Sequence, residues 1–124
     1  MKDMYRILTL NKISPAGLDL LDPRQYRWGE EEPAPDGVLV RSAAMHDMEL
    51  PQSLRAIARA GAGVNNIPIG LCSQRGIAVF NTPGANANAV KELTLLGLLL
   101  SARKVWPGMK WVQTLAGQEG VAKL

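Results

Sequence analysis

The sequence of 124 residues has little cysteine, few aromatic residues and no long hydrophobic run. Its single cysteine, Cys72, excludes an intrachain disulfide framework and a multi-cysteine metal site, so we expect a reducing, cytoplasmic location and no metal. The longest apolar stretch, residues 93–100, is much shorter than the roughly 20 residues of a membrane span. The N-terminus contains no signal-peptide core. Neither export nor a membrane association is therefore expected.

The chain also lacks a strong excess of charge of one sign. Fourteen basic and eleven acidic residues give a formal net charge of +3, and the basic residues are scattered along the chain without a Lys/Arg block. The tryptophans Trp28, Trp106 and Trp111 are too dispersed to form a stacking platform for bases. This pattern argues against a nucleic-acid partner. The length and the hydrophobic content of 47% are those of one globular domain.

Apolar runs bounded by turn residues alternate with helical segments. We expect strands over residues 5–10, 26–28, 37–41, 55–60 and 77–80, the last being typical of a strand buried on both faces. We expect helices after Ser14-Pro15, over residues 48–54 and 69–74, from Asn86 or Asn88 to residue 103, and over residues 109–115 beyond an interruption at Pro107-Gly108. This order predicts a doubly wound, flavodoxin-like α/β fold, with a parallel sheet of about five strands and helices on both faces.

Polar or glycine-rich residues follow four of these strands directly, at Asn11, Arg41-Ser42, residues 61–66 and residues 81–84. In open α/β sheets, ligands bind beyond the carboxyl ends of the strands. The small residues Gly61, Ala62 and Gly63 allow a tight turn whose N–H groups reach a carboxylate or phosphate, and Arg41 and Arg59 offer planar forks for the same anions. The pattern therefore predicts a small acidic ligand. The alternative is a plain turn flanked by surface arginines.

The run from Arg59 to Asn66 begins like a dinucleotide-binding fingerprint and then departs from it. Asn66 stands where the third glycine belongs, and the region about 20 positions on, which requires an acidic residue for the ribose, holds Ala85 and Asn86. We therefore predict that the loop binds something smaller than NAD. His46, the only histidine, is expected on the surface, and Cys72 is expected to fill space in a short helix. No catalytic residue is assigned.

Three motifs, residues 40–43, 59–67 and 76–86, resemble in order and spacing the amino-terminal substrate domain of the D-3-phosphoglycerate dehydrogenases, within the D-isomer-specific 2-hydroxyacid dehydrogenase family. The resemblance covers residues 4–124. It implies NAD-dependent oxidation of 3-phospho-D-glycerate to 3-phosphohydroxypyruvate in serine biosynthesis. It implies that the loop amides hold the substrate carboxylate and Arg41 the phosphate end, with Arg59 a weaker candidate. The assigned substrate-binding residues are Arg41, Ser42, Arg59, Gly61, Ala62, Gly63, Val64 and Asn65.

Two departures from the family pattern are Ala62 in place of threonine and Asn65 in place of aspartate. The resemblance assigns residues 1–88 to the substrate-binding domain and residues 89–124 to the interdomain helix and the start of a cofactor domain. The family's glycine fingerprint and its catalytic arginine, glutamate and histidine have no match up to Leu124. We therefore expect NAD in the full-length enzyme, and neither cofactor binding nor activity from this chain alone. Leucines on several faces of the long helix predict a homo-oligomer. The alternative is a free-standing small-anion-binding or interaction module.

Overall fold

The computed structural model describes residues 4–117 and divides the chain into two compact units, Met1–Ala85 and Asn86–Leu124. The first unit contains a sheet and two short helices, and the second contains two helices. Each unit is described by itself.

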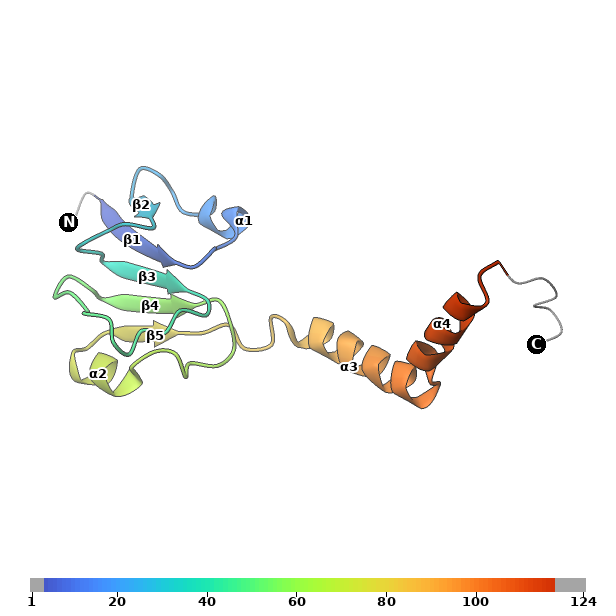
Figure 1. The fold of residues 1–124 in the computed structure, drawn as a ribbon. Helices are drawn as coiled ribbons and strands as arrows, with labels where there is room; N and C mark the ends of the chain where they lie inside the picture. The colour runs from blue at the N-terminus through green and yellow to red at the C-terminus, as the bar shows by residue number, and fades with distance from the viewer. Residues whose placement is uncertain (1–3, 118–124) are drawn as a thin grey trace. The chain divides into compact units, whose positions relative to one another are not determined.

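The first unit is a five-stranded parallel sheet, so the predicted α/β fold class is confirmed. The strands lie in the order β2-β1-β3-β4-β5 (Figure 1), which is the flavodoxin-like order with its switch point between β1 and β3. Their bounds are Tyr5–Leu10 for β1, Tyr26–Gly29 for β2, Gly37–Val40 for β3, Ala56–Arg59 for β4 and Ala78–Phe80 for β5.

Two short helices lie in the crossovers between these strands. Helix α1 (Pro15–Leu18) follows β1, with Pro15 at its first position, where the missing N–H costs nothing. Helix α2 (Ile69–Gln74) precedes β5. Because β2 and β3 flank β1 on opposite sides, right-handed crossovers place the connection through α1 on one sheet face and the connection through α2 on the other.

The core of this unit lies between one sheet face and the chain that runs from β3 to β5. The pairing register puts Leu8, Val38, Ile57 and Val79 in one row across four strands. Buried side chains of the connections pack on this row: Met45, Leu50, Leu54, Ile67, Cys72 and Ile77. Ile57 is completely buried, whereas Phe80 on the opposite face is 59% exposed. The apolar interior is therefore concentrated on one side of the sheet.

Two expectations for this unit are wrong. Residues 48–54 form turns and bends rather than a helix, because Pro51 lacks an N–H and disfavours helical backbone at the residue before it. The leucines of this segment, Leu50 and Leu54, still reach the core. Strand β5 is an edge strand with an exposed side, so it is not buried on both faces.

The second unit consists of α3 (Ala87–Ala102) and α4 (Val105–Thr114). The helices are separated at Arg103-Lys104, where Lys104 adopts left-handed backbone with φ of 50°, and not at Pro107-Gly108 as expected. Pro107 lies in the first turn of α4, where a proline removes no helical hydrogen bond. Asn86 precedes α3 without a side-chain capping bond, and Asn88 instead donates from Nδ2 to Glu92 Oε1 at 2.7 Å.

Helix α3 exposes an unusual amount of apolar surface. Its exposed large side chains are Val90, Leu93, Leu95, Leu96, Leu98, Leu99 and Leu100. They occupy successive positions and therefore several sides of the helix. Among residues 4–117, no helix combines the length and apolar content that crossing a bilayer requires.

We predict that Ile57→Ala destabilises the chain by about 3 kcal/mol, because it removes a fully buried side chain from the centre of the strand row. Urea unfolding followed by circular dichroism measures this. Leu20→Ala is the control, since Leu20 is 85% exposed and its truncation should change the free energy of unfolding by less than about 0.5 kcal/mol. Equal effects of the two substitutions would contradict the position of the core.

Candidate anion-binding site

Four loops meet at the carboxyl edge of the sheet because the parallel strands end there together. Leu10, Val40 and Arg59 are aligned across β1, β3 and β4. The residues that follow these strands and β5 are Asn11, residues 41–43, residues 61–65 and Asn81-Thr82. We call residues 61–65 the glycine loop. All residues that the sequence predicted for the site therefore lie at this one edge.

At the switch point, Asn11 connects the end of β1 to the turn after β3. Its Oδ1 accepts hydrogen bonds from the backbone N–H of Ser42 at 2.9 Å and of Ala43 at 2.6 Å, and the Ser42 hydroxyl lies 3.5 Å away. Asn11 has φ of 68°, in the left-handed region that asparagine tolerates better than most residues. The turn that carries Arg41 and Ser42 is thus held from a neighbouring strand.

Five donors hold the carbonyl oxygens of the glycine loop. Gly61 O accepts from Thr82 N at 3.0 Å, Ala62 O from Asn81 Nδ2 at 2.6 Å, and Val64 O from Ile67 N at 3.0 Å. Asn65 O lies 2.9 Å from His46 Nε2, and Gly63 O accepts from the Arg59 guanidinium. Every carbonyl from residue 61 to residue 65 therefore has a donor.

The amides of the same loop are mostly unpaired. Gly61 N–H donates to Arg59 O within a turn. Among the described residues, the N–H groups of Ala62, Gly63 and Val64 have no hydrogen-bond partner. Free backbone donors next to satisfied acceptors make a loop suited to an anion rather than to a cation.

Arg59 is committed to the loop itself. Its Nε donates to Arg41 O at 3.0 Å, and its second contact is with Gly63 O. A Cβ at Gly63 would lie 2.8 Å from Arg59 Nη1, and one at Gly61 would lie 3.4 Å from Nε. Neither glycine has a positive φ. The close guanidinium, and not unusual backbone, is therefore what these two glycines accommodate.

Arg41, in contrast, is exposed, and its side chain has no partner among the described residues. The opposite, amino edge of the sheet has paired charges, where Arg6 and Arg27 both contact Glu32 and the Arg6 N–H donates to the buried Asp36. Arg41 therefore brings a positive charge without a partner among the described residues to the same sheet edge as the free amides of the glycine loop.

Asn66 explains why the dinucleotide fingerprint fails here. It is 8% exposed, donates from Nδ2 to Ala43 O at 2.8 Å, and accepts from Met45 N at 2.8 Å through its backbone oxygen. A glycine would lose the first of these bonds. Helix α2 begins only at Ile69, so no helix N-terminus follows the glycines directly to receive a pyrophosphate. The loop does not fit a dinucleotide.

Neither His46 nor Cys72 is arranged as a nucleophile or its base. His46 is exposed and contacts a backbone oxygen. Cys72 is buried, and burial raises the pKa of its thiol although Arg75 partly opposes this. The thiol is therefore the protonated, unreactive form at neutral pH. Within residues 4–117, no three His, Cys, Asp or Glu side chains lie close enough to hold a metal ion.

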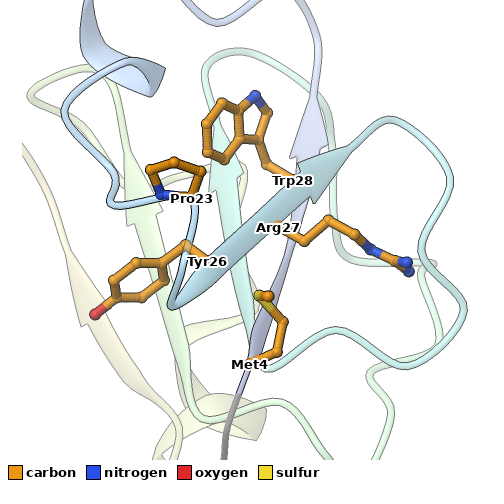
Figure 2. Close-up of a pocket in the computed structure, with 5 residues that line it drawn as sticks. All are labelled: Met4, Pro23, Tyr26, Arg27 and Trp28. Carbon is orange, nitrogen blue, oxygen red and sulfur yellow. The ribbon is translucent and has the colours of Figure 1, made fainter.

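Two hollows of the first unit lie away from this edge. One, of about 330 Å³, is on edge strand β2 and is lined by Met4, Pro23, Tyr26, Arg27 and Trp28 (Figure 2). A second, of about 210 Å³, lies near the amino ends of β1, β3 and β4 between Tyr5, Ile7 and Ala56. Both are mainly apolar, and neither is lined by a residue of the loops at the carboxyl edge.

Comparison with known proteins identifies the family. Residues 34–124 match the D-isomer specific 2-hydroxyacid dehydrogenase, catalytic domain. This chain belongs to that family. It is 41% identical over 78 residues to a D-3-phosphoglycerate dehydrogenase of Archaeoglobus fulgidus, an alignment that covers 60% of this chain and 15% of the relative.

Two solved structures share the fold. The NAD⁺-bound 3-phosphoglycerate dehydrogenase of Entamoeba histolytica superimposes with a TM-score of 0.64 at 26% identity, over 78% of this chain and 39% of that chain. The glyoxylate/hydroxypyruvate reductase of Sinorhizobium meliloti, in complex with NADP and malonate, gives 0.67 at 27% identity, over 89% and 38%. The chain therefore spans well under half of the length of these relatives.

The sequence did not show that three asparagines hold the site together. Asn11, Asn66 and Asn81 each hydrogen-bond through the side chain to the backbone of another loop. The rule that ligands bind after strands located Asn11 and Asn81, but it gave no reason to separate them from other loop residues. His46 was correctly expected on the surface, and its contact with Asn65 was not foreseen.

We predict that Gly63→Ala destabilises the chain by about 1 kcal/mol, because the added Cβ displaces the Arg59 guanidinium from its hydrogen bond. In an Arg59→Met background the same substitution should cost much less. Urea unfolding of the four combinations measures the coupling. Gly70→Ala is the control, because a Cβ there meets open space within α2 and should stabilise the helix. An equal cost of Gly63→Ala in both backgrounds would show that Arg59 does not require the glycine.

Proposed function

We propose that this chain is the substrate-binding portion of an NAD-dependent dehydrogenase that oxidises 3-phospho-D-glycerate to 3-phosphohydroxypyruvate in cytoplasmic serine biosynthesis. One observation carries the proposal: three consecutive free amides of the glycine loop lie at the same sheet edge as Arg41, a cation with no partner among the described residues. Such a set is matched to a small molecule with two anionic ends. The family membership and the phosphoglycerate dehydrogenase relatives support the choice of substrate.

In the proposed site, the N–H groups of Ala62, Gly63 and Val64 donate to the substrate carboxylate. The Arg41 guanidinium binds the phosphate, and Ser42 lies next to it in the same turn. Asn65 contributes backbone to the loop without a charge. Arg59 acts on the loop rather than as the principal ligand, because two of its donor groups already bind backbone oxygens.

We propose that NAD serves the complete enzyme and does not bind this chain alone. NAD would supply the hydride acceptor, and the residues after β4 do not fit it, since Asn66 and the late start of α2 interrupt the fingerprint. Hydride transfer also requires a base at the substrate hydroxyl, and His46 contacts Asn65 instead. The 124-residue chain is therefore proposed to bind substrate without turning it over.

We predict that calorimetry detects binding of 3-phosphoglycerate to the chain with a Kd below about 1 mM. Arg41→Ala should weaken it about tenfold by removing a charged hydrogen-bond donor. Arg24→Ala is the matched control, because it removes the same charge from a residue paired with Asp22. The proposal fails if the chain does not bind the ligand, or if the two variants bind equally. With NAD added, absorbance at the nicotinamide band should not change, and measurable turnover would refute the proposed inactivity.

We also propose that the chain self-associates through α3. The supporting observation is that its leucines are 42–69% exposed on several sides. Light scattering should give a mass above that of the monomer, and the combined substitutions Leu95→Glu and Leu99→Glu, one turn apart, should lower it. Leu20→Glu, at an exposed leucine of the first unit, should leave the mass unchanged. A monomeric wild-type chain at high concentration would contradict this proposal.

A further inference from the structure

We infer that Asn11 is a positioning residue of the anion site, acting as a neutral acceptor that fixes the turn carrying Arg41 and Ser42. The inference rests on the proposed function, because it assigns Asn11 a task within the same site. Asn11 lies at the β1/β3 switch point, directly after Leu10. Its contacts are with residues 31 and 32 positions further along the chain.

A single oxygen atom carries this connection. The last pair of residues aligned between β1 and β3 is Leu10 with Val40, and the two strands are no longer paired after it. The Asn11 Oδ1 accepts hydrogen bonds from the N–H groups of both Ser42 and Ala43. It therefore serves as the acceptor that a paired strand would otherwise provide for these two amides. Loss of this atom would free the turn immediately after Arg41.

Three requirements meet at this position, and asparagine fulfils all of them. The backbone φ of 68° favours glycine, asparagine or aspartate. The contacts require a side-chain oxygen, which glycine lacks. Aspartate offers that oxygen and accepts hydrogen bonds strongly, but it would add a negative charge beside a site that holds an anion. Asparagine combines the backbone conformation, the acceptor and electrical neutrality.

The test compares Asn11→Gly with Asn11→Asp in the full 124-residue chain. Asn11→Gly relieves the backbone but should make the Ser42 and Ala43 amides exchange with solvent about tenfold faster, as measured by NMR hydrogen exchange, and should weaken 3-phosphoglycerate binding. Asn11→Asp should keep slow exchange and wild-type thermal stability, yet weaken binding about fivefold at low salt and less at high salt. Inorganic phosphate, used as a second probe, should show the same order.

Gln52→Glu is the control for net charge, because Gln52 lies in the turn that leads into the amino end of β4. It should bind both probes like the wild type. Unchanged amide exchange in Asn11→Gly would overturn the positioning role, and Asn11→Asp binding as tightly as Gln52→Glu would overturn the need for neutrality. If the wild type binds neither probe while Asn11→Gly speeds exchange, the proposed function fails and the connection by Asn11 stands.

Discussion

The structure depends on the register of its parallel strands, which is fixed by one row of buried and partly buried apolar side chains. Leu8, Val38, Ile57 and Val79 face the same side of four strands, and the connecting chain between β3 and β5 packs over them. A slip of one residue would turn each of these side chains to the other face. The same register decides where the strands end, and so it brings loops that are distant in sequence to one edge. The core and the candidate site are two results of a single constraint.

At that edge, side-chain amides replace the helix N-terminus that many α/β proteins use to bind anions. Asn81 occupies the carbonyl of Ala62, and Asn66 connects the loop to the turn after β3. With its carbonyl oxygens already bonded, the glycine loop retains only donors to offer a ligand. The loop therefore presents positive potential from its N–H groups without an adjacent helix N-terminus, since α2 begins several residues later.

The sequence predicted what depends on local pattern. Apolar runs ended by turn residues located every strand to within two residues, and the strand ends indicated which loops meet at the carboxyl edge. Residues 48–54 were mispredicted because leucine spacing was given more weight than Pro51, and the helix break at Lys104 was missed because left-handed backbone at lysine has no sequence marker. Arg41 and Arg59 looked equivalent in the sequence. Only the contacts of Arg59 with Arg41 O and Gly63 O distinguish them, and such contacts between separate loops have no periodicity.

The different contacts of Arg41 and Arg59 bear on which acid the proposed site would prefer. In the proposed site, the backbone amides of the glycine loop bind a carboxylate. 3-Phosphoglycerate and hydroxypyruvate both have this group, so the loop alone would not select between them. Selection requires a group that meets the other end of the molecule. Arg59 supplies positive potential, but its fork is partly used by backbone oxygens. Arg41 retains its whole fork, and bidentate binding of phosphate depends on where that fork is held. In the proposed site, preference for a phosphorylated acid therefore rests on Arg41 and on the turn that Asn11 fixes next to it.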